Sequence, residues 1–345
     1  MSFTSRLINW YTERKRDLPW RRTKNPYAIW LSEIILQQTR VDQGLPYWER
    51  FVSTYPTISD LAQAPEDDVL RLWQGLGYYS RARNLHAAAK HVFENLDGKF
   101  PSTYDEIIKL KGVGPYTAAA ISSICFNEVR PVVDGNVFRF VSRYFGIFED
   151  ISGGGARLVF EKLLLEYIDQ NEPGDFNQAL MEYGATVCSP KPSCDDCIFK
   201  HECFAFAKNQ QSELPVKTKK VKTRNRFFQY IVFKTKNHYL LNQRLGKDVW
   251  NSLYDFYLLE GELAEEDVAN EISEMGIKDL TFNEISETYI HILSHQKIHA
   301  TFYQVTISEK EAQKIMEKTK LRSYTENEML NLPKAKLIVN YLQRF

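Results

Sequence analysis

The chain has 345 residues, enough for two domains, and its 43% hydrophobic and 26% charged residues are typical of a globular protein. Its 44 basic and 44 acidic residues give a formal net charge of zero, so any face that binds nucleic acid has to be locally concentrated. Charges interrupt the N-terminal segment and no apolar stretch approaches ~20 residues, so we expect neither a signal peptide nor a membrane span, and a cytoplasmic location.

Helical patterns dominate the chain up to about residue 205. Asn25 and Pro26 form a helix start, because Asn caps well and Pro suits the first helical position. Residues 27–38 then carry apolar side chains around most of the helix, which indicates deep packing in a bundle. Further helices are expected over residues 60–74, 80–95, 103–110, 116–126 and 155–170.

A glycine hairpin and two acidic residues stand out in this helical region. Gly112 and Gly114 permit a tight turn and leave amide N–H groups at the next helix start open to a phosphate, although a plain helix–helix turn is the alternative. Asp134 follows an apolar run, where a helix cap is the alternative to a catalytic role. Glu33 lies among apolar neighbours, and it either points to solvent, pairs with an arginine such as Arg21 or Arg22, or serves chemistry.

Four cysteines lie in one short run with the spacing C-x5-C-x2-C-x5-C, namely Cys188, Cys194, Cys197 and Cys203. Four soft sulfur donors so close in sequence suit a metal centre better than disulfides. Zinc is an alternative, but zinc modules more often use two C-x2-C pairs separated by a longer loop.

The character of the chain changes after the cysteines. Residues 208–226 are expected to form a basic linker that acts as a solvated tether, since residues 215–226 hold six cations. Strand patterns follow at residues 228–233, 238–241, 250–259 and 297–306, and helical patterns at 265–275 and 309–318. These patterns predict an α+β second domain.

Three segments and the cysteine run resemble adenine DNA glycosylases of the MutY type: LSEIILQQT at 31–39, LKGVGPYTA at 110–118 and VDGN at 133–136. The resemblance runs nearly end to end. It implies an all-α helix-hairpin-helix glycosylase domain over residues 1–207, with the hairpin at about 104–126 and the cysteine loop at 188–203. The linker, 208–226, then leads to a smaller MutT- or Nudix-like domain over residues 227–345.

The resemblance also implies a [4Fe–4S] cluster on the four cysteines. One departure is that the family's usual first gap has six residues and this chain has five, so the loop between Cys188 and Cys194 must be tighter.

Catalytic roles follow from the same resemblance. Glu33 would protonate the adenine and Asp134 would remain ionised and stabilise positive charge on the sugar, while Tyr116 and Asn136 help place the sugar and Asp134. Endonuclease III-type relatives carry a lysine at the place of Tyr116, and a phenol cannot form a Schiff base. We therefore expect a monofunctional enzyme that hydrolyses the glycosidic bond with water.

The resemblance further assigns residues to DNA binding. Two loops, residues 37–39 and residues 75–83, would insert into the duplex and offset the cost of base flipping. The second domain would read 8-oxoguanine through Ser294 and His295, for which an ordinary surface turn is the alternative; Leu293 replaces the family's usual Phe. The Glu-rich metal box of Nudix hydrolases is missing between Gly261 and Gly276, so nucleotide hydrolysis is not expected. The full set expected to contact DNA is Arg21, Gln38, Thr39, Leu76, Tyr78, Gly112, Gly114, Ser294 and His295.

The sequence thus predicts a monomeric bacterial enzyme of base-excision repair that acts at the nucleoid. It would remove adenine opposite 8-oxoguanine, and opposite guanine, in double-stranded DNA. One alternative is an endonuclease III-like glycosylase and lyase for oxidised pyrimidines, against which Tyr116 and the extra domain argue. The other is a non-enzymatic iron–sulfur protein that binds DNA, against which the two carboxylates argue.

Overall fold

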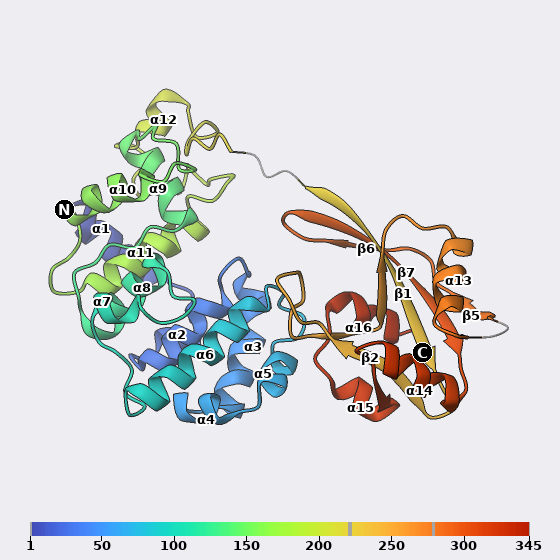
Figure 1. The fold of residues 1–345 in the computed structure, drawn as a ribbon. Helices are drawn as coiled ribbons and strands as arrows, with labels where there is room; N and C mark the ends of the chain where they lie inside the picture. The colour runs from blue at the N-terminus through green and yellow to red at the C-terminus, as the bar shows by residue number, and fades with distance from the viewer. Residues whose placement is uncertain (1, 220–222, 278–279, 345) are drawn as a thin grey trace. The chain divides into compact units, whose positions relative to one another are not determined.

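The computed structural model describes residues 2–219, 223–277 and 280–344. The chain divides into two compact units, Met1–Gln63 with Asn84–Lys219 and Ala64–Arg83 with Lys220–Phe345. The first is helical and the second contains a sheet with helices on it (Figure 1), so the predicted fold class is confirmed. Among the described residues, the helices are too short or too polar to cross a membrane.

The first unit is a bundle built around one central helix, α11 (Pro173–Thr186), which packs against α1, α8 and α9. Its core is aromatic and includes Phe140, Phe176, Tyr183 and Phe199. The other helices are α1 (Phe3–Arg14), η1 (Pro19–Arg21), α2 (Pro26–Ile35), α3 (Val41–Thr54), α4 (Ile58–Gln63), α6 (Ser80–Asn95), α7 (Tyr104–Ile107), α8 (Pro115–Phe126), α9 (Gly135–Phe145), α10 (Ala156–Leu165) and α12 (Phe204–Lys208).

Helix ends differ from the sequence prediction where backbone geometry intervenes. Asn25 caps α2 as expected, accepting from the Tyr27 N–H at 2.9 Å. The helix nevertheless ends at Ile35, before Gln38, whose φ of 55° is left-handed. The single helix predicted over 60–74 is wrong, because it is split into α4 and α5 (Glu66–Leu72) at Pro65, which lacks an N–H.

The second unit is organised on a long central pair of parallel strands, β1 (Arg224–Lys234) and β7 (Gln296–Thr306), in register from Arg224↔Gln296 to Lys234↔Thr306. The sheet order is β3-β2-β1-β7-β5, with β4 on β1, β6 on β7 and β8 on β2. The remaining strands are β2 (His238–Gln243), β3 (Tyr254–Asp255), β4 (Tyr257–Glu260), β5 (Phe282–Ile285), β6 (Tyr289–Ile292) and β8 (Arg322–Thr325).

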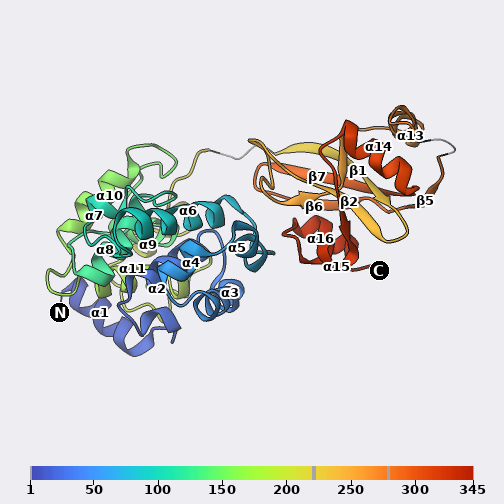
Figure 2. The ribbon, with the colours of Figure 1, turned by 60° about the horizontal axis from the view of Figure 1, so that its bottom comes forward.

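Helices cover both faces of this sheet (Figure 2). Side chains such as Ile231 and Val305 pack against α13 (Glu265–Glu274) and α14 (Glu309–Lys318). On the opposite face Phe302 stacks on Tyr341 of α16 (Lys336–Leu342) at 4.0 Å between ring centroids. Successive side chains of a strand point to opposite faces of the sheet, and this alternation separates the residues that contact α13 and α14 from those that contact α16. The other C-terminal helix is α15 (Glu326–Asn331).

The second unit also contains residues 64–83, which the sequence prediction placed within a continuous first domain. Arg71 donates to the Asn331 side chain at 3.0 Å, and Gln74 accepts from the Lys334 N–H at 2.9 Å. The Tyr79 hydroxyl donates to the Lys334 carbonyl at 3.1 Å. Helix α5 and the glycine-rich loop after it are therefore held by contacts distant in sequence.

The predicted linker, residues 208–226, is not a free tether over its whole length. The Ile151 N–H donates to the Val216 carbonyl at 3.0 Å, and Thr218 hydrogen-bonds the Asp150 carboxylate. Its last part, from Arg224, already belongs to β1. Residues 220–222 lie outside the described part of the chain.

Candidate active site

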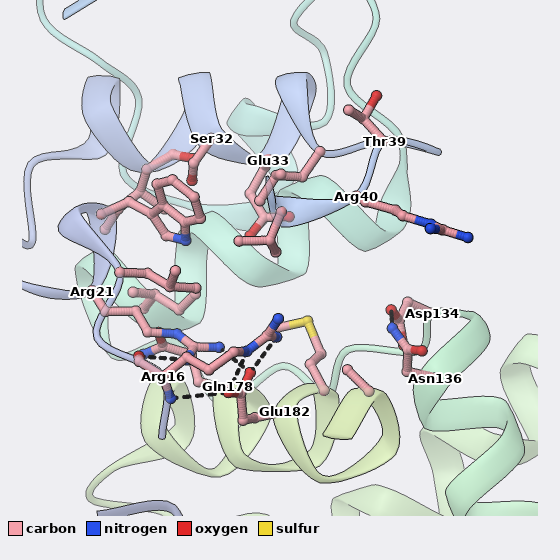
Figure 3. Close-up of a pocket in the computed structure, with 18 of the residues that line it drawn as sticks. Arg16, Arg21, Ser32, Glu33, Thr39, Arg40, Asp134, Asn136, Gln178 and Glu182 are labelled. Atoms are coloured by element: carbon pink, nitrogen blue, oxygen red, sulfur yellow. Dashed lines mark hydrogen bonds and ion pairs between the residues drawn. The ribbon is translucent and has the colours of Figure 1, made fainter. Parts of the chain in front are cut away.

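A cavity of about 680 Å³ in the first unit brings together residues that are far apart in sequence (Figure 3). Glu33 reaches it from α2, Tyr116 from the first turn of α8, and Asp134 and Asn136 from the start of α9. In Figure 3, Asp134 and Asn136 lie on one side, and a polar group on the other side comprises Arg16, Arg21, Gln178 and Glu182. Thr39 also lines the cavity, whereas Gln38 is exposed.

Glu33 stands on a helix whose other side chains are almost all buried. Burial raises its pKa to about 7; the nearby Asp134 adds to the rise, and the Tyr116 hydrogen bond and the charge of Arg21 oppose it. Neither arginine considered from sequence forms an ion pair with it: Arg21 pairs with Glu182 at 2.7 Å and Arg22 with Asp17. The acid is therefore protonated to a substantial degree near neutral pH.

Asp134 caps a helix and also lines the cavity, so the cap predicted as one alternative does not take the carboxylate away from the site. Its Oδ1 caps α9 by accepting from the Val137 N–H at 2.7 Å, and its Oδ2 accepts from Asn136 Nδ2 at 2.9 Å. The same carboxylate lines the cavity. Burial raises the pKa of Asp134, and the hydrogen bonds from Val137 and Asn136 oppose that rise. A carboxylate oriented in this way is pre-organised toward the cavity.

Asn136 is itself held by Arg139, a residue that the sequence analysis missed. Arg139 Nη2 donates to Asn136 Oδ1 at 2.9 Å and to the Gly184 carbonyl at 2.6 Å, and its Nε donates to the Cys188 carbonyl at 2.7 Å. One guanidinium thus connects Asn136, at the start of α9, with Cys188, the first cysteine of the run. Arg139 follows Asn136 by three residues, and this spacing on a helix would have predicted that their side chains are neighbours.

Tyr116 lies against both Glu33 and α11. Its hydroxyl is 3.0 Å from Met181 Sδ and hydrogen-bonds Glu33. Burial raises the pKa of Tyr116 well above its ordinary value, so the side chain remains a neutral phenol. It can donate a proton in a hydrogen bond but offers no amine to a sugar carbon.

The glycines before Tyr116 differ in what they require. Gly112 has a φ of +80°, and a Cβ there would come within 2.6 Å of the Asn84 Cβ, so only glycine fits. Gly114 is the N-cap of α8 with an ordinary φ of −98°, and it makes no side-chain cap. A Cβ at Gly114 would meet nothing within 4 Å, so space is left open in front of the helix N-terminus.

Helix α11 supplies further cavity residues that were not found from sequence. Gln178, Met181, Glu182 and Ala185 all line it. Their i, i+3, i+4, i+7 spacing is the signature of one helix face, and it was the signal available. Glu182 differs from the others because it is a carboxylate with only 1% of its side chain exposed, and a buried charge requires partners.

Comparisons with known proteins identify the family of the chain. The profile of the HhH-GPD superfamily base excision DNA repair proteins matches residues 31–164, and that of the NUDIX domain matches residues 229–344. The adenine DNA glycosylase of Buchnera aphidicola subsp. Schizaphis graminum is 36% identical over 259 residues, which cover 74% of each chain. The chain belongs to the adenine DNA glycosylases. The predicted family and the prediction that the chain is an enzyme are thereby confirmed.

Other relatives are consistent with that assignment. The adenine DNA glycosylase of Mus musculus is 43% identical over 223 residues, which cover 62% of this chain and 43% of the mouse protein. A solved structure of endonuclease III trapped as a covalent intermediate on DNA matches with a TM-score of 0.53, covering 60% of this chain and 94% of that one. At 23% identity this last likeness shows a shared fold.

The four cysteines of the glycosylase line a second, small cavity together with Phe140, Tyr144 and Phe199. Arg143 approaches Cys188 Sγ at 3.6 Å, and the Tyr183 hydroxyl lies 3.0 Å from Cys197 Sγ. Within the described residues, no three His, Cys, Asp or Glu side chains are grouped closely enough to hold a single metal ion. Four cysteine side chains around one small apolar space are a donor set that an iron–sulfur cluster can use.

The second unit of the glycosylase has a cavity of about 470 Å³ that joins two predicted DNA-reading segments. Leu76 and Tyr78 line it from the glycine-rich loop, and Ser294 and His295 from the turn between β6 and β7. The Tyr78 and Ser294 hydroxyls hydrogen-bond each other. Tyr78 is 46% exposed with a φ of 48°, whereas Leu76 is only 6% exposed, so the Tyr78 ring is the more accessible of the two side chains.

Proposed function

We propose that this adenine DNA glycosylase removes adenine mispaired with 8-oxoguanine, and with guanine, from double-stranded DNA. The observation that carries the proposal is the cavity of the second unit, where an exposed aromatic wedge, Tyr78, meets the polar pair Ser294 and His295. Adenine itself is a normal base, so selection has to read its partner. A hydroxyl and an imidazole beside the wedge suit the altered N7 and C8 edge of 8-oxoguanine.

Extrusion of the adenine would place it in the cavity of the first unit. Unstacking costs a few kcal/mol, and insertion of the Tyr78 ring offsets that cost. The open N-terminus of α8 behind Gly114 supports a DNA phosphate near the extruded nucleotide. Binding at this hairpin carries no sequence information and serves to position the strand.

Two carboxyl groups in different environments then divide the chemistry. Glu33, whose pKa is raised to about 7, donates its proton to a ring nitrogen of the adenine and so makes the base a good leaving group. The Tyr116 hydroxyl holds the Glu33 carboxyl in place from α8. Cleavage develops positive charge on the sugar, and Asp134 faces that charge.

Water completes the reaction by adding its oxygen to the sugar carbon that has lost the adenine, and the proton that it releases replaces the one that Glu33 gave to the base. At 4 Å and an effective dielectric of 20, the attraction between Asp134 and a full sugar charge is about 4 kcal/mol, and it is absent from the neutral ground state. Asn136 and Arg139 hold the Asp134 carboxylate against rotation. Because Tyr116 supplies no amine, the product is an intact abasic strand.

We further propose that Cys188, Cys194, Cys197 and Cys203 hold a [4Fe–4S] cluster, which when bound ties the cysteine loop into one rigid element. Purified under anaerobic conditions, the protein should be brown and contain about four irons per chain. Cys197→Ser should lose colour and iron, whereas Cys125→Ser should keep both. One equivalent of zinc without iron would contradict the assignment.

The pH dependence of excision should reflect Glu33. Its pKa in the folded protein is about 7, above the ordinary 4.5, so the folded state holds this proton more tightly than the unfolded state does. The stabilisation of the fold that results is complete below about pH 4.5 and is lost as the pH rises through about 7. With limiting enzyme, the excision rate should hold below pH 7 and fall about tenfold per unit well above it. Binding of an uncleavable duplex over the same range is the control. A rate that stays flat to pH 9 would remove Glu33 from its role.

Replacing Ser294 and His295 together by alanine should reduce the preference for A opposite 8-oxoguanine over A opposite guanine. Two hydrogen bonds of about 1 kcal/mol each correspond to roughly a 30-fold loss of preference. Base removal should survive, because Glu33 and Asp134 lie in the first unit. Single-turnover rates on the two duplexes, followed by alkali and strand scission, measure it.

The matched control is Thr288→Ala with His299→Ala. Thr288, just before β6, hydrogen-bonds Thr301 on β7, and His299 on β7 stacks on Phe227 of β1. This double variant removes the same kinds of group outside the cavity and should keep the preference. If both double variants kept it in full, the second unit would not be the reader.

A further inference from the structure

Glu182 is a buried carboxylate that the chemistry above does not use. Its Oε1 accepts from the Arg16 backbone N–H at 3.0 Å and from Arg16 Nε at 2.7 Å. Its Oε2 accepts from Arg16 Nη2 and from Arg21 Nη2, both at 2.7 Å. Burial by itself would raise the pKa of Glu182, but the hydrogen bonds from the two arginines outweigh burial and lower it to about 2. The group is therefore ionised at every working pH.

The partner of interest is Arg21, whose side chain is 11% exposed and lines the same cavity as Glu33. Besides the bond to Glu182, its Nη1 donates to the Arg16 carbonyl at 3.1 Å, and its guanidinium lies over the Tyr11 ring at 5.5 Å. These two bonds use two of the five donors of a guanidinium. Because the guanidinium is planar and is held by the Glu182 carboxylate and the Tyr11 ring, its orientation is fixed. The N–H groups of Arg21 that are not used in these contacts therefore point in fixed directions as well.

We propose that Glu182 is a positioning residue: it fixes the Arg21 guanidinium at the cavity wall, where it can donate to an acceptor nitrogen of the extruded adenine, and it compensates the arginine charges beside Glu33. The proposal rests on the proposed function of this cavity and names a determinant of base recognition within it. Figure 3 shows the arrangement, with Glu182 between Arg16 and Arg21 on the side of the cavity opposite Asp134.

The second part of the proposal concerns charge. The titratable and charged groups that line the cavity with Glu33 or influence it are Arg16 before η1, Arg21 on η1, Arg40 and Asp42 at the start of α3, Tyr116 and Cys125 on α8, Asp134 before α9 and Glu182 on α11. Among the cations of this set, Arg21 lowers the pKa of Glu33. Glu182 offsets that cation from the far side. Without its charge, Arg21 and Arg16 would be uncompensated, and Glu33 would give up its proton at a lower pH.

A purely structural role for Glu182 makes different predictions. The carboxylate also ties residues 16 and 21 to α11, so its loss could simply loosen the wall of the cavity. That would lower the melting temperature and reduce the excision rate by the same factor at every pH. The two roles are separated by the pH profile rather than by the rate.

The test is single-turnover excision of adenine opposite 8-oxoguanine by the full chain from pH 5.5 to 9. For Glu182→Gln we expect the rate at pH 7.5 to fall by about 10–100-fold, because a misplaced binding group costs that much. The midpoint of the fall in rate at high pH should move down by about one unit. Arg21→Met removes the cation itself and should move the midpoint up. In the variant that carries both substitutions, the fold-loss in rate should be smaller than the product of the two single fold-losses, because the two residues act together.

Two further variants complete the design. Glu182→Asp keeps the charge and should keep the native midpoint while losing part of the rate. Glu161→Gln breaks a partly exposed ion pair with Arg157 on α10 and should change neither rate nor midpoint. Binding to a duplex with an abasic site should be unaffected in all of them, because no adenine is present.

The outcomes are distinct. A native midpoint in both Glu182→Gln and Arg21→Met would overturn the proposal and leave Glu182 a structural residue. If Glu182→Gln does not fold, Arg21→Met decides alone, and an unshifted midpoint there has the same meaning. Failure of the native chain to release adenine at any pH would instead refute the proposed function.

Discussion

Glu33→Gln is expected to reduce excision of adenine by about 10²–10⁴-fold, the usual contribution of a general acid. The amide has nearly the shape of the acid, so the cavity, with Tyr116 beside it, should be preserved. Binding to the mismatched duplex should change little, because the proton is needed only in the transition state. Single-turnover kinetics and a binding isotherm on the same duplex separate the two effects.

The stability of this variant provides an internal check. At pH 8 the native Glu33 is largely ionised in a buried site, since its pKa is about 7, and glutamine removes that charge. The melting temperature at pH 8 should therefore not fall. Glu49→Gln, an exposed position on α3, is the matched control and should behave as the native enzyme. Excision within tenfold of native by Glu33→Gln would show that another group donates the proton.

Asp134→Asn should reduce excision by about 10³-fold, which corresponds to the ~4 kcal/mol of charge stabilisation that the carboxylate offers at 4 Å. The substitution is informative because Asn is as good an N-cap as Asp. The amide oxygen of Asn can still accept a hydrogen bond from the Val137 N–H, as Asp134 Oδ1 does in the native protein. Helix α9 should therefore form normally, and the melting temperature should change little.

The comparison with Asp134→Ala separates the two roles of the residue. Alanine removes the cap as well as the charge and should add a loss of roughly 1 kcal/mol in unfolding free energy. Excision should be low in both variants, but only alanine should be less stable. If asparagine retained native activity and alanine did not, Asp134 would be a cap without a catalytic role.

The sequence by itself determined the chemistry available to this protein. Glu33 in an apolar helix, the turn at Gly112, Asp134 after an apolar run and the four cysteines were each visible from local pattern. Local rules also place caps and glycine turns, and these depend on few neighbours: Asn25 caps α2, and Gly112 has the positive φ that its turn requires.

Only the tertiary structure decided which of these groups meet and what surrounds them. Arg16 and Arg21 contact Glu182 from positions 166 and 161 residues away, and α5 docks on residues near Lys334, 260 residues beyond Gln74. Arg139 joins Asn136 to Cys188 across the bundle. No local pattern encodes such pairs, because they depend on how whole helices pack. The raised pKa of Glu33 is of the same kind: it comes from burial among separate elements and from charges that only the fold brings near.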